Sequence, residues 1–272
     1  MGQLDGKRIV ITGGASGIGA ASAALMTERG GRVAILDFDK PALDRVVASV
    51  PGSLGIDCDC IDSTAVDAAV GQVVDEFGGI DILFCCVGPL GDEVKKNSMA
   101  EHGKQAAKEG RLMFSESVTS AVLDLTDEAW HAEFASVVDN VFYCTRAVLP
   151  HLLRQGSGSI ITSSSIHGIQ GQPGVPHYSA AKAAINGFVR SVAKEVAPHG
   201  IRINSIAAGY VDTPRLRTLT SPELQDGFRR MVPMGRIAEP VEIAGVACFL
   251  ASEDSSYLSG QVLSPNGAYV TV

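Results

Sequence analysis

The chain has 272 residues, 46% of them hydrophobic, which is enough for one large α/β domain or two small ones. Its formal net charge of −8 argues against nucleic acid or an anionic membrane surface as a partner. No apolar run reaches the ~18 residues of a membrane span, and the residues before the first predicted strand lack the apolar stretch of a signal peptide.

The six cysteines form no Cys-x-x-Cys pair and no cluster with the spacing of a zinc site, so no metal is expected. Most of them lie in apolar runs. This favours reduced, buried thiols in a cytoplasmic protein over a metal or redox role. The six are Cys58, Cys60, Cys85, Cys86, Cys144 and Cys248.

The chain begins with a strand, a glycine-rich turn and a helix. β-branched residues predict a strand over 8–12, alanines predict a helix over 20–29, and the turn between them reads Thr-Gly-x-x-x-Gly-x-Gly. Glycines let the backbone approach a pyrophosphate, and the start of the helix supplies free N–H groups. The pattern predicts a dinucleotide site formed by Gly13, Ser16, Gly17, Ile18 and Gly19.

An acidic residue follows the second predicted strand, which covers 32–36. Asp37 lies close to the offset from the glycine turn at which a carboxylate bonds the adenosine ribose. A carboxylate there repels a 2′-phosphate, and Ser16 offers no compensating cation, so the pattern favours NAD over NADP. The alternative is an acid that merely ends a strand.

Alternation of strands and helices continues to residue 88. Helices are predicted over 42–50 and 64–77, a strand over 54–61, and a fully apolar strand over 81–87 that Gly88 ends. The third strand carries several acids, of which Asp59 is expected to face the adenine, and Cys60 and Gly88 are also expected to contact the cofactor. This rhythm predicts a parallel sheet covered on both faces.

Residues 89–123 break the rhythm, because the segment is long for a connection. A capping-box pattern at its centre predicts a short polar helix over 101–109. The segment reads as a solvated surface excursion or, alternatively, as a flap over the substrate or an oligomer contact.

The second half of the chain contains a possible proton-transfer set. A helix is predicted from Thr126 through Asn140 to residue 153, and an apolar strand over 158–162 leads to Ser165. Tyr178 and Lys182 are four apart, so they share a face of the predicted helix 178–196. A nearby ammonium favours the phenolate and lowers the phenol pKa, and Ser165 could bond the same substrate oxygen. Alone, a Tyr-x-x-x-Lys pattern is more often a chance surface pair.

The remaining elements complete a single domain. A strand is predicted over 201–206, a loop over 207–214, a substrate lid over 210–236, a helix over 240–251 and a short strand over 261–263. There is no repeat and no linker that indicates a second domain. The fold class is therefore α/β, a doubly wound parallel sheet over 1–272 with an insertion at 89–123.

Together these motifs resemble the short-chain dehydrogenase/reductase family over nearly the full length. The resemblance implies that Tyr178 is the general acid/base, that Lys182 lowers its pKa and bonds the nicotinamide ribose, and that Ser165 polarises the carbonyl. It further implies that Asn140 holds a water linked to Lys182. Val211 and Thr213 would hold the nicotinamide carboxamide. Similar proteins are commonly homotetramers, paired through the helices that carry Asn140 and Tyr178.

Three departures from the family pattern stand out. The usual Asn-Asn-Ala-Gly after the fourth strand is Cys85-Cys86-Val87-Gly88, the usual Pro-Gly before the nicotinamide loop is Ala208-Gly209, and 89–123 is an insertion. The lost amide is expected to alter local stability or adenine contacts. Two packed thiols are favoured over a vicinal disulfide at Cys85-Cys86. His167 and His177 flank the site and could bond a polar substrate group, although histidines that fill their environment are the better expectation.

The resemblance implies an NAD-dependent oxidoreductase that interconverts a secondary alcohol and a ketone. Apolar residues near the site indicate a moderately hydrophobic, cyclic or aromatic substrate. Two alternatives stay open: an NADPH-dependent biosynthetic ketoreductase of the 3-oxoacyl type, and a nucleotide-binding protein on the same fold without turnover.

Overall fold

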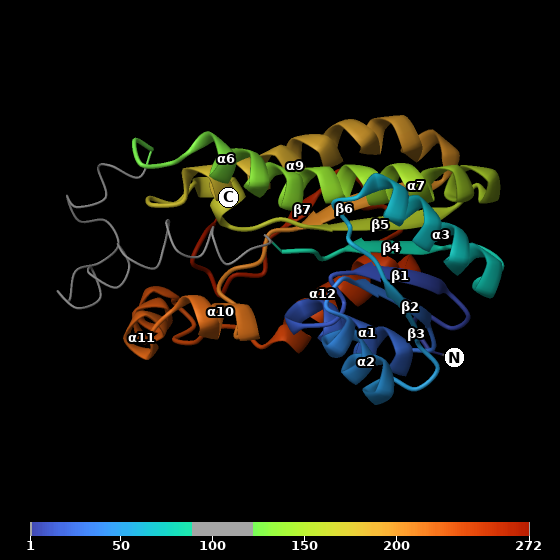
Figure 1. The fold of residues 1–272 in the computed structure, drawn as a ribbon, viewed down its shortest axis with the longest axis horizontal. Helices are drawn as coiled ribbons and strands as arrows, with labels where there is room; N and C mark the ends of the chain where they lie inside the picture. The colour runs from blue at the N-terminus through green and yellow to red at the C-terminus, as the bar shows by residue number, and fades with distance from the viewer. Residues whose placement is uncertain (1, 89–121, 272) are drawn as a thin grey trace.

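Seven strands form one parallel sheet in the order β3-β2-β1-β4-β5-β6-β7 within residues 2–88 and 122–271, the ranges that this computed structural model describes (Figure 1). The strands are short apolar runs, because each central strand is buried on both faces. They are β1 (Arg8–Thr12), β2 (Arg32–Asp37), β3 (Leu54–Asp57), β4 (Ile82–Cys85), β5 (Gly158–Ser163), β6 (Ile201–Ile206) and β7 (Val262–Leu263).

Helices cover both faces of the sheet. On one face, α3 (Ser63–Phe77), α7 (Asn140–Gln155) and α9 (Pro176–Val196) share one apolar core with the strands. On the other face, α1 (Gly17–Glu28), α2 (Lys40–Ser49) and α12 (Pro240–Ala251) form a second core. Figure 1 shows the two helical layers above and below the strands. The expected doubly wound α/β fold is confirmed.

The topology opens a crevice where the strand order reverses. The chain moves outward from β1 to β3, returns to β4 beside β1, and then moves outward again to β7. In open parallel sheets, the loops at the carboxyl ends of the strands separate at such a reversal and leave room for a ligand. Here these are the loops 13–16, 86–88 and 207–213, which follow β1, β4 and β6.

Three strands are shorter than the sequence predicted, the last of them by one residue, since β7 begins at Val262. The third strand was expected over 54–61, but β3 ends at Asp57, and Asp59 closes a local turn by accepting a hydrogen bond from the Ile61 N–H at 3.1 Å. The fourth was expected over 81–87, but β4 covers Ile82–Cys85. Each of these two strands ends where its partner ends: Asp57 pairs with Asp37, the last residue of β2, and Cys85 pairs with Thr12, the last residue of β1.

The helix expected from 126 to 153 is divided into three parts. Residues Asp127–Phe134 form α6, Ala135–Asp139 form a π-helical segment, η2, and α7 follows from Asn140 to Gln155. Segments of π-helix inside α-helices occur frequently at functional sites. The short helix expected over 101–109 lies outside the described residues.

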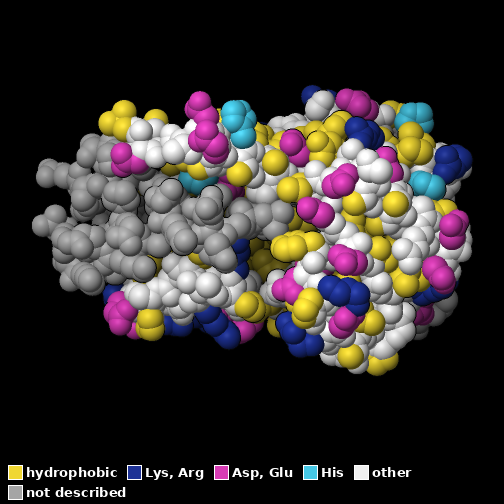
Figure 2. Space-filling view, in the orientation of Figure 1, with side chains coloured by type: hydrophobic (Ala, Val, Ile, Leu, Met, Phe, Trp, Pro, Cys, Tyr) yellow, Lys and Arg dark blue, Asp and Glu magenta, His cyan; other side chains and the backbone are white. Residues whose placement is uncertain are grey.

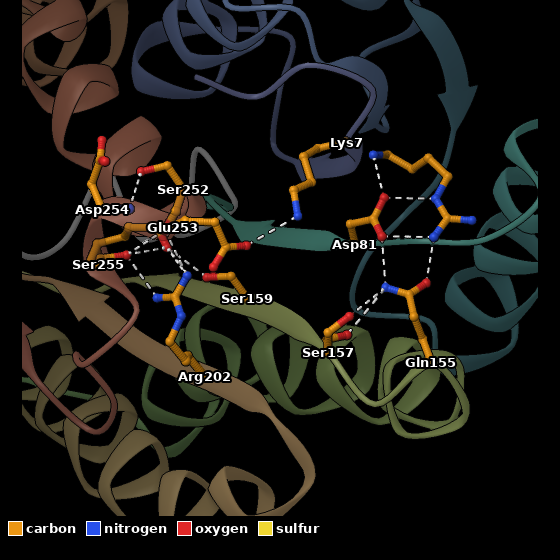
Figure 3. Close-up of polar contacts among 12 residues, drawn as sticks. Lys7, Asp81, Gln155, Ser157, Ser159, Arg202, Ser252, Glu253, Asp254 and Ser255 are labelled. Atoms are coloured by element: carbon orange, nitrogen blue, oxygen red, sulfur yellow. Dashed lines mark hydrogen bonds and ion pairs between the residues drawn. The ribbon is translucent and has the colours of Figure 1, made fainter. Parts of the chain in front are cut away.

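Polar side chains hold the amino ends of the strands together (Figure 3). Asp81 accepts hydrogen bonds from the Arg8 Nε and from the Gln155 Nε2, at 2.8 and 2.7 Å. Arg202 on β6 donates to the Leu250 and Ser252 carbonyls at the end of α12, each at 3.1 Å. The amino ends of the strands therefore have a structural role, and we expect the ligand at the carboxyl ends.

The segment expected to form a substrate lid contains two helices, α10 (Pro214–Leu219) and α11 (Pro222–Met231). They lie at one end of the molecule, away from the bulk of the sheet (Figure 1). A small apolar cluster joins them to the loops after β5 and β6; its buried members are Ile166, Tyr210, Phe228, Val232 and Ile237. The remaining short helices are α8 (His167–Gln170), η3 (Ala197–His199) and η4 (Glu253–Ser255).

The described surface carries charges of both signs. Figure 2 shows Asp and Glu side chains interspersed with Lys and Arg over one face of the molecule. A helix long and apolar enough to cross a membrane is not found in the part of the chain that the structure describes.

Candidate active site

A cleft of about 500 Å³ opens at the carboxyl ends of the strands. Every site residue predicted from the sequence lines it, with the exception of Asn140. The predicted residues that line it are Gly13, Ser16, Gly17, Ile18, Gly19, Asp37, Asp59, Cys60, Gly88, Ser165, Tyr178, Lys182, Val211 and Thr213.

The glycine-rich turn leaves no room for side chains where a dinucleotide pyrophosphate would pass. Gly13 has φ of +64°, and a Cβ on it would lie 2.8 Å from the Val87 Cα. A Cβ on Gly19 would lie 2.2 Å from the Gly13 carbonyl oxygen. Ser16 precedes the first turn of α1 without a side-chain cap, so the N–H groups there can bind an anion. The turn therefore fits a dinucleotide.

Acidic residues surround the position expected for the adenosine. Asp37, 8% exposed, accepts hydrogen bonds from the Ala15 N–H at 3.0 Å and the Asp39 N–H at 3.1 Å. Its carboxylate thus braces the glycine turn as well as facing the cleft. Asp39 and Asp59 line the same region. Among the described residues that line the cleft, the cations are Lys182 and Arg215.

Ser165, Tyr178 and Lys182 meet at the other end of the cleft, where the loop after β5 packs on α9. The Lys182 Nζ lies 5.7 Å from the centre of the Tyr178 ring and donates to the Ser163 carbonyl at 2.7 Å. The loop can approach α9 closely because residue 168 is glycine: a Cβ there would lie 2.6 Å from the Lys182 carbonyl carbon. The structure thus brings the predicted proton-transfer set together.

The electrostatics of this set differ from the expectation in one respect. Burial raises the pKa of Tyr178 above its ordinary value, although a hydrogen bond with Ser165 and the charge of Arg215 act to lower it. We expected Lys182 to lower the phenol pKa, but burial outweighs the favourable contacts. Burial also lowers the pKa of Lys182 itself to about 8, because an ammonium is costly to bury.

Asn140 is the predicted site residue that is absent from the cleft lining. Its side chain is fully buried and does not line the cleft. The Asn140 Nδ2 donates to the Ser136 carbonyl inside the π-helical segment, where the wider turn leaves that carbonyl available. The buried Asn140 Oδ1 has no hydrogen-bond partner among the described residues, so the water-holding role predicted for Asn140 stays a prediction.

Two of the departures from the family pattern, at Cys85-Cys86 and at Ala208, lie beside the cleft, and neither involves a disulfide bond. Cys85 and Cys86 are both free thiols; Cys85 is buried in the core, and Cys86 lines the cleft. Burial raises the pKa of Cys86 to about 12, so the thiol stays protonated at neutral pH. The Ala208 carbonyl accepts the Ile166 N–H at 3.1 Å, which ties the nicotinamide loop to the loop of Ser165.

Sequence reasoning missed two charged residues of the cleft. Glu133, 1% exposed, is the last but one residue of α6, and Arg215 is the second residue of α10. Burial raises the pKa of Glu133 to about 7 and lowers the pKa of Arg215. One signal was available: Glu133 lies four residues before the apolar Val137, so both fall on the buried face of the predicted helix.

A doubly wound sheet with a glycine turn at its switch point and a Ser–Tyr–Lys set beside it defines a nicotinamide-dinucleotide oxidoreductase fold. The chain belongs to the short chain dehydrogenase family, whose family model matches residues 7–224. It is therefore an oxidoreductase of the class that acts on alcohol and ketone groups.

Individual relatives cover nearly the whole chain. The 3-oxoacyl-(acyl-carrier-protein) reductase of Thermotoga maritima is 33% identical over 98% of this chain and 99% of its own length. The meso-2,3-butanediol dehydrogenase of Serratia marcescens is 31% identical over 97% and 95%. A solved structure of 7α-hydroxysteroid dehydrogenase with NADH and 7-oxoglycochenodeoxycholic acid has a TM-score of 0.83 at 26% identity, covering 97% of this chain and 94% of that one.

Proposed function

We propose that the protein is an NAD-dependent oxidoreductase that interconverts a secondary alcohol and a ketone of moderately hydrophobic character. The observation that carries the cofactor choice is the acidic end of the cleft. A 2′-phosphate beside Asp37 would face Asp39 and Asp59 as well, and no described cation lines that end. Negative charges placed together repel one another, so this end of the cleft disfavours the 2′-phosphate of NADP.

In this proposal the nicotinamide, when bound, accepts or donates the hydride. Tyr178 takes the proton of the alcohol during oxidation and returns it during reduction, because its phenol is the titratable group that Ser165 contacts. Ser165 holds the substrate oxygen against the phenol. Lys182, anchored to the Ser163 carbonyl, binds the nicotinamide ribose and keeps a positive charge near the phenol.

The remaining predicted contacts stay proposals. Val211 and Thr213 line the cleft after β6 and would hold the nicotinamide carboxamide, while Asp59 and Cys60 would contact the adenine. Asn140 does not line the cleft, but its buried Oδ1 has no hydrogen-bond partner among the described residues, which supports the proposal that it holds a water linked to Lys182. The apolar residues of the cleft, including Ile166, Val175 and Phe228, support a hydrophobic substrate body.

The second candidate is a ketoreductase of the 3-oxoacyl type, which the Thermotoga relative favours. If that reaction uses NADPH, the Asp37 carboxylate argues against it, because it repels the 2′-phosphate. A protein without turnover is the third candidate, and the intact Ser165, Tyr178 and Lys182 arrangement speaks against that one.

Comparison of the two cofactors tests the proposal. Each is offered with a panel of secondary alcohols, and reduced nicotinamide is followed by absorbance. We expect turnover with NAD and at least about tenfold lower kcat/KM with NADP. Asp37→Asn keeps the acceptor for the Ala15 N–H but removes the charge, so the preference should fall about tenfold or more.

Asp44→Asn is the matched control, since Asp44 is exposed and pairs with Lys40 on α2 away from the cleft. It should leave the preference unchanged. A higher kcat/KM with NADP than with NAD in the wild type would instead support the ketoreductase of the 3-oxoacyl type. Nucleotide binding without oxidation of any alcohol or reduction of any ketone would establish the third candidate.

We also propose that the protein is a homotetramer paired through α7 and α9. The support is an exposed aromatic surface on α7, where Phe142 is 43% exposed and the Arg146 guanidinium stacks over it at 5.0 Å. Exposed apolar patches of this kind mark contact surfaces.

A further inference from the structure

Beyond the proton-transfer set, the cleft contains a second group of polar side chains. Glu133 comes from α6, His177 from the first turn of α9, and His167 from α8; all three are buried and line the cleft. His177 directly precedes Tyr178, and the His167 ring stands edge-on to the Tyr178 ring at 5.7 Å between centres. The group therefore adjoins the place where the reacting carbon would lie.

These side chains do not satisfy one another. The Glu133 Oε2 lies 3.9 Å from the His177 Nε2, which is close enough for electrostatic attraction but too long for a hydrogen bond. Among the described residues, the Glu133 Oε1, the His177 Nδ1 and both His167 ring nitrogens have no hydrogen-bond partner. Buried polar atoms in folded proteins are almost always paired, so unpaired atoms on three residues of one cleft indicate a ligand group that bonds at least one atom of each residue.

The atoms left over specify the chemistry of that group. A neutral imidazole has one donor and one acceptor nitrogen, and a carboxylate accepts. Burial lowers the pKa of His167 to about 4, so its ring is neutral, and the raised pKa of Glu133, about 7, lets it donate or accept near neutral pH. A hydroxyl group donates one hydrogen bond and accepts up to two, so it can bond the Glu133 carboxyl and one nitrogen of each imidazole.

A carboxylate on the substrate fits less well. When Glu133 is ionised, a second anion beside it is repelled, and the two neutral imidazoles bring no compensating charge. Arg215 lines the cleft, but its charge already acts on both Glu133 and Tyr178. A substrate carboxylate would therefore compete with Glu133 and Tyr178 for the positive charge of Arg215.

We propose that Glu133, His177 and His167 form a subsite for a second hydroxyl group of the substrate, carried close to the reacting carbon. The substrate class is then a diol, with an α-hydroxyketone as its oxidised form, on an otherwise apolar frame. This inference rests on the proposed alcohol dehydrogenase function and specifies its substrate.

Three probes of matched ring size test the subsite: cyclohexanol, cyclohexane-1,2-diol and 2-hydroxycyclohexanecarboxylate. Initial rates with NAD should give the diol a kcat/KM at least about tenfold above that of cyclohexanol. In Glu133→Leu, which replaces the acid by an apolar side chain of similar size, that ratio should fall about tenfold or more. Glu128→Gln, an exposed acid on the same helix, should leave the ratio unchanged.

Binding separates this inference from the proposed function. The NAD complex of Tyr178→Phe is titrated with each probe by calorimetry, with and without the added Glu133→Leu change. Tighter binding of the diol that is lost with Glu133→Leu supports the subsite, whether or not turnover is seen. Equal binding of diol and cyclohexanol overturns it, as does tighter binding of the carboxylate. Absence of turnover with all three probes counts against the dehydrogenase proposal alone.

Discussion

The phenol of Tyr178 sets the pH dependence of the proposed reaction. Oxidation of an alcohol requires the ionised phenol, and burial holds its pKa above the ordinary value. We therefore expect kcat/KM for oxidation to rise about tenfold per pH unit through the neutral range without levelling off below pH ~10. Reduction of a ketone requires the protonated phenol, so kcat/KM for reduction should be flat over the same range. Initial rates in both directions measure this.

Tyr178→Phe should lower both rates by about 10²-fold or more, because no proton is then exchanged with the substrate. Tyr257→Phe is the control, since Tyr257 is fully exposed. A plateau in the oxidation profile between pH 7 and 8 would contradict the assignment. It would point to Glu133 or Lys182 as the group that titrates, whose pKa values are about 7 and about 8.

Single residues also show how far sequence reasoning reached into the site. Positions defined by spacing within one element, such as Tyr178 and Lys182, could be predicted, since one helical face brings them together. The role predicted for Asn140 stays a prediction, because its side chain is buried behind a π-helical segment that no local pattern in the sequence indicated. The spacing from Val137 could have indicated that Glu133 is buried, but its place in the cleft depends on how α6 packs against α9, which no local pattern contains.

At the scale of elements, the active site depends on the close approach of α8 to α9. A Cβ on Gly168 would lie 2.6 Å from the Lys182 carbonyl carbon and 2.8 Å from the Ala183 nitrogen. Gly168→Ala should therefore push α8, with Ser165 and His167, away from Tyr178. We expect at least a tenfold loss in kcat/KM and a destabilisation of about 1–3 kcal/mol, measured by steady-state rates and thermal unfolding.

Gly71→Ala provides the comparison, because Gly71 lies within α3 and a Cβ there meets no atom within 4 Å. It should be neutral or stabilising by up to about 1 kcal/mol, since alanine favours the helix. Equal behaviour of the two variants would mean that the α8–α9 contact does not constrain the site.

The element types were predictable, whereas several of their ends were not. Helix 240–251 was predicted with the bounds that α12 has, because a proline starts it and a run of polar residues follows it. β3 stops four residues short of the prediction, because Asp57 pairs with the last residue of β2 and the residues after it form a turn that lines the cleft. Strand ends depend on neighbouring strands, and these are not adjacent in the sequence.

At the scale of the whole molecule, the exposed face of α7 has the character of a buried contact. Phe142 and Leu153 are 43% and 40% exposed on a helix whose opposite side is in the core. An aspartate in the centre of a subunit interface would have to be buried without a partner, which is strongly unfavourable. On the surface of a monomer the same change would cost little.

Sedimentation velocity of Phe142→Asp therefore tests the assembly. We expect the wild type to sediment as a tetramer and the variant as a smaller species. Ala68→Asp is the control, because Ala68 is an exposed residue of α3, a helix outside the proposed contact. A wild type that sediments as a monomer would contradict the proposal, as would a variant that remains tetrameric. If assembly is lost while the unfolding temperature of the monomer is kept, the apolar face of α7 exists for the contact between subunits and not for the fold of one chain.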